Sequence, residues 1–399
     1  RDRITEDLSF VSQMTVEEYT LYLKYQEIHR KYPTHEIGTL FGSEKQFVNE
    51  KHVKLINEVK SNIWMPNSYE DFEKLEPELI YTSKEGDDNF SAGSWSEIWN
   101  CIRTFTSTMK NSSNIGRNLH YVVRDKPTGK YLGVICITGD FIDLTPRDNH
   151  IGWERDFKTN SGILNHSCIG STIVPLQPLG YNYTGGKLLA LLCLSEDIQK
   201  QWEENYGNKL VSVTTTSLYG KSKTGGLSQY DRLKHWKKCG YSNGSMTYEL
   251  TKDTEREMLK YGEKNYNDRF FSLYVATREN GQPWKRDHRN RFRSFLFPKL
   301  EIPKNIIRSD HQRGIYWSAL YDNSKEFLRG EIKEDQLVRS QDFSTEGLTT
   351  LWKEKYAAKR INNLMNSERQ RLDDTLFYDD IAFMSWDETK QKYLGQVGR

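Results

Sequence analysis

The chain has 399 residues, enough for two or three domains of ordinary size. Its 36% hydrophobic and 28% charged content, with 23 Tyr, 17 Phe and 10 Trp, excludes a disordered chain. The net charge of +2 gives no global field towards nucleic acid or membranes, so contact with a polyanion has to come from a local patch. No apolar run approaches the roughly 18–20 residues that span a bilayer, so no membrane partner is predicted.

Five cysteines are scattered along the chain, and no two of them form a Cys-x-x-Cys pair. This spacing favours a reducing, intracellular compartment. Cys136 and Cys193 fall in apolar runs, which predicts small side chains of the core. His166 and Cys168 lie close together, but no second pair with zinc-ligand spacing accompanies them, so no metal site is predicted.

Residues 1–116 are predicted to form a helical region. The segment 15–32 carries a capping threonine, a glutamate three residues later, and apolar residues at helical spacing. A second helix is predicted near 44–62 and a third over 95–109, whereas 63–93 shows no regular period and is interpreted as irregular.

Residues 117–250 change to a strand-like period and are predicted to form the core domain. Two β-prone runs over 118–138 flank a short turn with Pro and Gly, which predicts a hairpin. The next predicted elements are a strand at 171–174, a helix at 186–205, a strand at 210–216 and a helix at 228–238. Because a helix connects the two strands, they are predicted to pair in parallel within an α/β fold.

Residues 251–399 are more charged and are predicted to form a basic, α-rich extension. Between 285 and 308, eight basic and two acidic residues are interleaved with phenylalanines. This pattern is typical of a surface that binds the DNA backbone. The candidate contacts are Arg286, Arg289, Arg291 and Arg293. The alternative is a solvated face, or a cluster that pairs with the acidic tail at 373–380.

A polar, glycine-bearing turn follows the strand at 171–174 and precedes the next helix. Its residues are Gln177, Gly180 and Asn182, followed by Gly185, Gly186 and Lys187. Main-chain N–H groups at a helix N-terminus hold phosphate, so the turn predicts exposed amides that bind a diphosphate. The alternative is a plain loop that needs glycine for its backbone conformation.

This order of hairpin, strand, glycine turn, helix, strand and helix, ending in Gly240-Tyr241, resembles the GNAT superfamily of N-acetyltransferases. The resemblance implies a GNAT-like mixed β-sheet core. It places Gln177, Gly180 and Asn182 in the loop that cradles the pyrophosphate of coenzyme A, with Gly185, Gly186 and Lys187 directly after it. Acetyl-CoA or another acyl-CoA is therefore the implied cofactor. Asn182 departs from the Gly or Ala usual in that family.

The resemblance also gives Tyr230 a role. In GNAT enzymes, a tyrosine in the corresponding helix often protonates the departing thiolate as a general acid. A phenol with a pKa near 10 suits this step. The alternative is a tyrosine packed in the core.

A second set of residues resembles the Druantia anti-phage protein A family. It comprises Arg147-Asp148-x-x-Ile151-Gly152-Trp153, a strand ending at Pro175, Trp202-x-x-x-Tyr206-Gly207, Tyr230, Trp236 and Gly240. The layout is also similar to the phage Mom-type acyltransferases that modify DNA. The shared region covers about residues 117–248. The resemblance implies DNA as a partner, a phage or anti-phage context, and the cytoplasm of a bacterial host.

Within this motif, Arg147, Asp148 and Trp153 are candidates for a substrate site. An arginine can bind a phosphate, a tryptophan can stack on a base, and an aspartate can act as a catalytic base. The alternative is an Arg–Asp ion pair beside a core tryptophan, which holds a loop in place.

Two functions from different classes therefore stay open. The first is a GNAT-like transferase that acts on DNA bases, which have to be extruded or single-stranded to react. The second is a DNA-binding or sensing component that keeps the fold without the cofactor, and the departure at Asn182 favours it. A viral structural protein is a third interpretation.

Overall fold

The structure is a computed structural model. It describes residues 1–40, 42–82, 94–111, 116–218, 228–242, 245–275, 287–303, 306–310, 312–365 and 376–396. The chain divides into two units, each formed by two separate segments. The larger unit comprises Thr20–Ser242 and Gln312–Arg399, and the smaller one comprises Arg1–Tyr19 and Asn243–His311.

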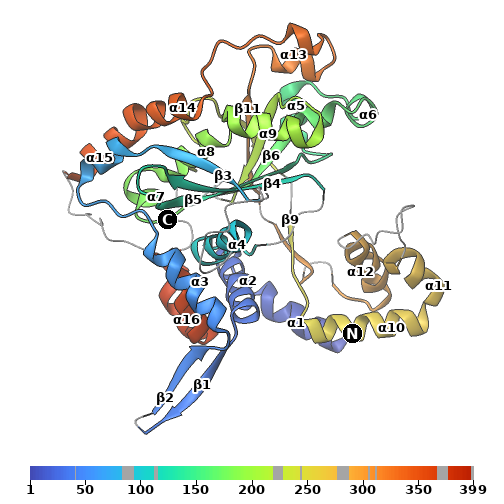
Figure 1. The fold of residues 1–399 in the computed structure, drawn as a ribbon. Helices are drawn as coiled ribbons and strands as arrows, with labels where there is room; N and C mark the ends of the chain where they lie inside the picture. Colours follow the sequence, from blue (N-terminus) through green and yellow to red (C-terminus); the bar gives the residue numbers. More distant parts are fainter. Residues whose placement is uncertain are drawn as a thin grey trace. The chain divides into compact units, whose positions relative to one another are not determined.

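The larger unit contains a seven-stranded mixed sheet (Figure 1). In spatial order, its strands are β3 (Pro77–Tyr81), β4 (Asn118–Asp125), β5 (Tyr131–Gly139), β6 (Ser167–Pro175), β7 (Ser212–Ser217), β11 (Gly314–Ala319) and β8 (Lys237–Tyr241). The pair β6–β7 is parallel and the other pairs are antiparallel. The predicted hairpin and the predicted parallel pair are both confirmed.

The parallel pair holds together over a short distance. Ser167–Gly170 of β6 pairs with Ser212–Thr215 of β7. Beyond this stretch, β6 continues against β5 and β7 continues against β11, so the two strands separate. The register between β5 and β6 also shifts, because Cys136 faces Thr172 whereas Ile137 faces Gly170, which leaves Ser171 as a bulge.

Alternating side chains of the strands are buried on both faces of this sheet, as expected for strands covered by helices on each side. One face packs against α8 (Gly185–Leu192), α9 (Glu196–Tyr206), α14 (Thr345–Trp352) and α15 (Ala358–Met365). The other face packs against α2 (Val16–Lys31), α3 (Glu50–Ser61), α4 (Trp95–Thr106) and α16 (Trp386–Tyr393). Cys136 and Cys193 are core residues, as predicted.

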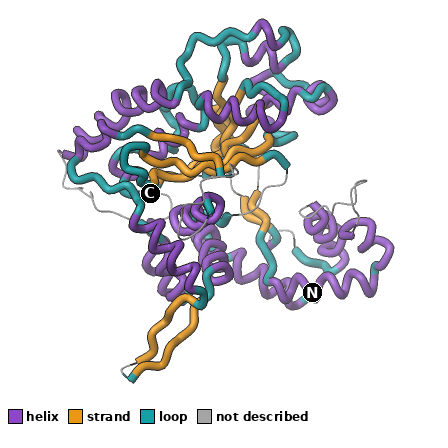
Figure 2. The backbone as a smooth tube through the Cα atoms, in the orientation of Figure 1, coloured by secondary structure: helices purple, strands orange, loops and turns teal. Residues whose placement is uncertain are grey.

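The larger unit also contains the short helices α5 (Thr145–Ile151), α6 (Arg155–Asn160), α7 (Leu179–Asn182) and α13 (Ser324–Leu328). A separate two-stranded ribbon is formed by β1 (Thr34–Thr39) and β2 (Gly42–Phe47), as Figure 2 shows. The helix predicted near 44–62 therefore begins only at Glu50, where the Asn49 side chain accepts a hydrogen bond from the Lys51 N–H.

Two further expectations are corrected. The helix predicted over 228–238 is wrong, because this stretch forms turns and then β8. Arg232 and His235 have φ values of 59° and 73°, in the left-handed region that ends a right-handed helix. The sheet also recruits β3 from the stretch predicted as irregular and β11 from the predicted extension.

The smaller unit is mainly helical. Its elements are α1 (Asp2–Ser12), β9 (Ser245–Thr247), α10 (Lys252–Asn265), α11 (Asn267–Phe270), α12 (Asp287–Lys299) and β10 (Arg308–Asp310). The two segments meet where Tyr19 packs edge-on against Tyr248 and where Asp7 accepts a hydrogen bond from the Thr251 N–H. Among the helices described in either unit, none is long and apolar enough to cross a membrane.

Candidate functional site

The glycine turn is a packed corner in which three of the expected phosphate-binding amides are already used. The Gly180 N–H donates to Leu176 (2.8 Å), the Asn182 N–H to Pro178 (3.0 Å) and the Lys187 N–H to Thr184 (2.8 Å), each time to a main-chain carbonyl. The side chain of Gln177 accepts the Tyr181 N–H at 2.7 Å. The expectation of exposed amides is therefore wrong at these positions.

Gly185 and Gly186 are buried, and each packs closely against another residue of the larger unit. A Cβ on Gly185 would lie 2.9 Å from the main chain of Leu179, and one on Gly186 would collide with the side chain of Gln229. Glycine is needed here because helix α8 packs tightly against the preceding turn and the Gln229 side chain. The described residues of this corner do not fit the pyrophosphate of an acyl-CoA.

The ammonium of Lys187 is bound by the chain itself. Its Nζ donates to the carbonyls of Gln229 at 2.7 Å and Asp231 at 2.9 Å. Burial lowers the pKa of this lysine to about 8. The cation predicted to meet a phosphate thus holds the turn at Gln229–Asp231, which precedes β8.

Tyr230 lies next to the glycine turn, because the Gln229 side chain contacts both Gly186 and the Tyr230 hydroxyl. Its hydroxyl accepts a hydrogen bond from the Gln229 side chain at 2.8 Å, and its ring packs against Trp236 and Tyr316. The residue is 5% exposed, and burial raises the pKa of the phenol well above 10. The structure therefore brings Tyr230 beside Gly186 and Lys187, but as a core residue.

Arg147 and Asp148 form part of a second, buried polar cluster. The guanidinium of Arg147 is fully buried and bonds Asp140 at 2.5 Å and Asp148 at 2.6 Å. Lys158 is buried as well and donates to Asp148 at 2.6 Å. Its main chain lies in α6, whereas Asp140 directly follows β5. Each charge therefore has an opposite charge beside it.

This cluster ties together the ends of three strands. Asp140 also accepts hydrogen bonds from Ser167, which begins β6, and from Thr214 in β7. Trp153 is 8% exposed, stacks 5.0 Å from the Arg147 guanidinium and donates its indole N–H to the carbonyl of Leu328. These contacts favour the packing interpretation of the Arg-Asp-Trp motif.

Asp140 and Lys158 complete the cluster but were not predicted. Their distances from Arg147 in the sequence do not predict a contact, because the cluster forms only where the end of β5 and α6 come together in the fold. Among the described residues, no group of three or more carboxylates, histidines or cysteines is placed to bind a metal.

The basic segment is only partly described. Arg286 and the side chain of Arg289 lie outside the described residues. Arg293 faces Glu255 at 3.7 Å, and its side chain is 12% exposed. Arg291 is exposed on α12. The predicted set therefore includes one arginine within an internal ion pair and one on an open surface.

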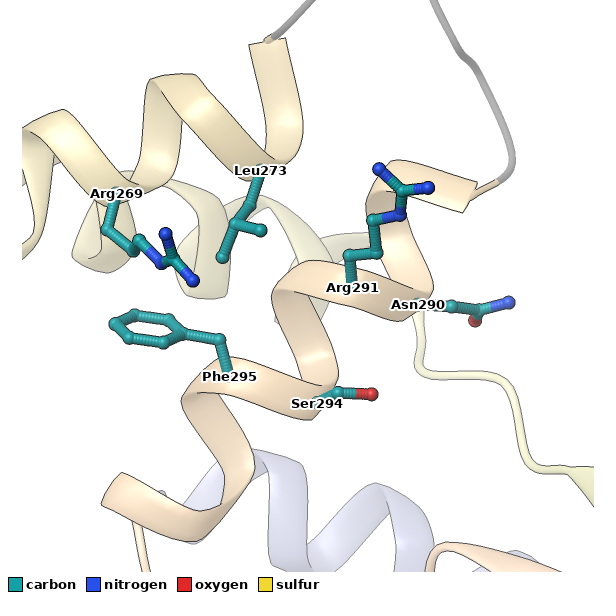
Figure 3. Close-up of a pocket in the computed structure, with 6 residues that line it drawn as sticks. All are labelled: Arg269, Leu273, Asn290, Arg291, Ser294 and Phe295. Atoms are coloured by element: carbon teal, nitrogen blue, oxygen red, sulfur yellow. The ribbon is translucent and has the colours of Figure 1, made fainter.

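That open surface is a shallow pocket of about 600 Å³ between α11, α12 and the π-helical segment Phe271–Val275 that follows α11 (Figure 3). Its lining residues are Arg269, Leu273, Asn290, Arg291, Ser294 and Phe295. In Figure 3, Arg269 lies above the ring of Phe295, at 6.0 Å from the ring centre. Lys299 approaches the same ring to 5.0 Å. We call this surface the α11–α12 basic face.

The α11–α12 basic face combines three cations with one aromatic ring. Arg291, Phe295 and Lys299 follow one another at four-residue intervals, which places them on one side of α12. Within the described part of the chain, Arg269, Arg291 and Lys299 form no ion pair with a carboxylate. Arg269 was missed in the sequence because it precedes the basic segment and meets it only through the fold.

The comparisons with known proteins agree with the second sequence resemblance. The profile of the family described as Druantia protein DruA matches residues 88–330, more than half of the chain. The Druantia protein DruA of Escherichia coli (strain UMEA 4076-1) is 25% identical over 309 residues, which cover 74% of this chain and 72% of that protein. No solved structure matches the chain.

The family match extends beyond 117–248, where the sequence resemblance lies, and takes in β11 and the basic segment. The matched region thus includes the strands of the mixed sheet other than β3, together with the α11–α12 basic face. The chain belongs to the family of Druantia protein DruA.

Proposed function

We propose that this chain is a DNA-binding component of a Druantia-type defence against phage, and that it contacts DNA through the α11–α12 basic face. The family match supports the defence context. The observation that carries the DNA contact is the cluster of Arg269, Arg291 and Lys299 around Phe295, without carboxylate partners among the described residues.

The spacing of the cations suits a phosphate backbone. Arg291 and Lys299 are eight residues apart on α12, or about 12 Å along a helix axis. Successive phosphates of one strand advance by about 3.4 Å along duplex DNA, so this side of the helix spans several of them. The half-buried ring of Phe295 lies between the cations and offers an apolar face for an unpaired base.

The salt dependence of DNA affinity tests this proposal. In the triple variant Arg269→Ala, Arg291→Ala, Lys299→Ala, we expect the slope of log affinity against log salt to decrease by about 2–3, since up to three phosphate contacts are lost. The measurement is fluorescence anisotropy on single-stranded and duplex oligonucleotides between about 50 and 200 mM salt.

A matched control exists in the same unit. Arg256 and Lys260 are exposed on α10 but pair with Asp253 at 2.9 Å and Glu257 at 3.3 Å. The double variant Arg256→Ala, Lys260→Ala removes two cations, against three in the triple variant, and is expected to change the slope less per charge removed, because both cations are already paired with carboxylates. An equal slope in the wild type and the triple variant would exclude the α11–α12 basic face as the DNA contact.

The second candidate is the GNAT-like transferase. The central parallel pair, which separates after four residues and is preceded by an antiparallel hairpin, favours it. The acyl-CoA would then need donors other than the amides of Gly180, Asn182 and Lys187. Calorimetry with acetyl-CoA on the wild type distinguishes the candidates: heat of binding supports the transferase, and no heat supports the DNA-binding component.

A further inference from the structure

A second pocket lies in the larger unit, at the end of the sheet formed by β8 and β11. Its volume is about 260 Å³. The residues that matter for its chemistry are His235, Lys237, Trp317, Tyr321, Gln341 and Phe343, and Asp322 lies on the same wall. The pocket shares no residue with the α11–α12 basic face, which belongs to the smaller unit.

Aromatic rings form the floor of this pocket. Trp317 is 4% exposed and Phe343 is 1% exposed, while Tyr321 is half-buried. The imidazole of His235 packs 4.8 Å from the ring centre of Phe343. A floor of flat side chains favours a flat, apolar ligand face, which gains contact area and stacking at little cost in ligand flexibility.

The floor also carries polar atoms that the chain leaves unused. The indole N–H of Trp317 is buried and has no acceptor among the described residues. A buried donor without an acceptor is unfavourable, so a ligand that supplies an acceptor gains this hydrogen bond. Burial lowers the pKa of His235 to about 4, so its imidazole is neutral and offers one donor and one acceptor.

The rim is positively charged. Lys237 is exposed and pairs in register with Trp317, and the ammonium of Lys325 lies 5.7 Å from the centre of the Trp317 ring. In the described ranges of the chain, neither lysine forms an ion pair. The carboxylate of Asp322 accepts a hydrogen bond from Ser340 at 2.9 Å. An anionic group in the pocket therefore meets the ammonium of Lys237, whereas Lys325 packs on the Trp317 ring and is not among the lining residues.

The backbone at the rim is held in an uncommon conformation. His235 has φ of 73°, and its neighbour Trp236 anchors the turn by donating its indole N–H to the carbonyl of Ala190 at 3.0 Å. Residues held in sparsely populated backbone regions are frequent at ligand sites. This turn fixes the imidazole against Phe343 and leaves Lys237 at the start of β8.

We propose that this pocket binds a nucleotide, with the base against the half-buried ring of Tyr321, a base acceptor on the indole N–H of Trp317, and the phosphate beside Lys237. A free aromatic side chain of a peptide fits the floor but makes no use of Lys237. The nucleotide can be a free monophosphate or one unit of a nucleic acid chain, and both share the same chemistry. This inference does not depend on the proposed DNA contact through α11–α12.

The test is isothermal titration of the full-length chain with the four nucleoside 5′-monophosphates, the four nucleosides and ribose 5-phosphate. We expect at least one monophosphate to bind with a dissociation constant of about 1 mM or tighter. The matching nucleoside is expected to bind about tenfold more weakly, because the phosphate contact is worth roughly 1.4 kcal/mol. Ribose 5-phosphate, which lacks the base, is expected to bind least.

Three substitutions locate the site. Lys237→Gln is expected to lower monophosphate affinity towards that of the nucleoside, whereas Lys234→Gln, which alters an exposed lysine outside the pocket, is expected to leave it unchanged. Gln341→Ala, at an exposed rim position, is expected to weaken the monophosphate and the nucleoside alike. Circular dichroism checks that each variant is folded.

Two results overturn the proposal: no heat from any monophosphate at about 1 mM, or binding that is equal in the wild type, Lys237→Gln and Gln341→Ala. Repeating the titration on the triple α11–α12 variant separates this inference from the DNA contact, because pocket binding is expected to survive there. Tighter binding of a dinucleotide than of its monophosphate supports a nucleic acid chain as the source, and equal binding supports a free nucleotide.

Discussion

The guanidinium of Arg147 has carboxylates on two sides and no exposed surface. A buried charge is stable only beside its opposite charges, so removal of one partner leaves an uncompensated charge in the core and destabilises the fold. Arg147 is therefore a structural residue of the strand ends, even though its sequence motif is also compatible with a phosphate contact.

At the residue scale, we expect Arg147→Met to lower the free energy of unfolding by about 3–5 kcal/mol, since it leaves the buried Asp140 without its cation and Asp148 with Lys158 alone. Urea denaturation followed by tryptophan fluorescence measures the loss. Arg155→Met is the control, because Arg155 pairs with Asp143 at 3.2 Å with 74% of its side chain exposed, and its loss is expected to be within about 0.5 kcal/mol. A stable Arg147→Met with weakened DNA binding would contradict the structural role.

The glycine corner acts at the scale of elements, because it sets how closely α7 and α8 approach each other. A Cβ at Gly185 would clash with the main chain of Leu179, which cannot move without opening the turn, whereas a Cβ at Gly186 would clash with the flexible side chain of Gln229. The two adjacent glycines therefore differ in the atoms that exclude a side chain at their positions: main-chain atoms at Gly185 and side-chain atoms at Gly186.

We expect Gly185→Ala to destabilise the larger unit by about 1–3 kcal/mol through overpacking. Gly186→Ala is expected to change the stability less, because the end of Gln229 can swing aside and alanine gains helix propensity. Thermal denaturation of both variants compares them directly. Equal stability of the two variants would show that the corner is looser than the contacts indicate.

Local patterns predicted some elements and missed others for identifiable reasons. The hairpin β4–β5 and the pair β6–β7 follow from periodicity and from a helical connection, both of which are contained in short segments. The stretch 228–238 has helical spacing of its apolar residues, but Arg232 and His235 adopt left-handed conformations that spacing does not report.

The candidate sites were predictable to a smaller extent. Arg291 was found by composition alone, whereas Arg269 joins it through tertiary structure. The amides of the glycine turn were expected to be free, but whether they bond internally depends on the path of α7. The pocket beside Trp317 combines β8, β11 and residues near 341, which no single motif contains.

At the scale of the whole molecule, the smaller unit is built from two segments that are separated in the sequence by Thr20–Ser242 of the larger unit. Leu8 of α1 is 1% exposed, and Tyr19 packs on Tyr248 and accepts a hydrogen bond from the Glu249 N–H at 2.8 Å. The first segment therefore stabilises helices that are distant in sequence and carry the α11–α12 basic face.

We expect Leu8→Ala to destabilise the smaller unit by about 2–5 kcal/mol. Hydrogen exchange detects this as faster exchange of the α10 amides, with the amides of β5 in the larger unit unchanged. Phe10→Ala is the control, since Phe10 is 52% exposed and its truncation leaves a smaller cavity. Equal acceleration in both units would mean that they unfold together.

The split construction of the smaller unit has a consequence for biosynthesis. His311 follows Tyr19 by 292 positions, so at roughly 5–20 residues per second the ribosome needs about 15–60 s between the two. During this interval, the nascent chain carries the apolar side of α1, with Ile4, Leu8 and Val11, before its packing partners have been translated. Chaperone binding to this stretch, and a higher yield on slow, cool expression, are the expected signs of that delay.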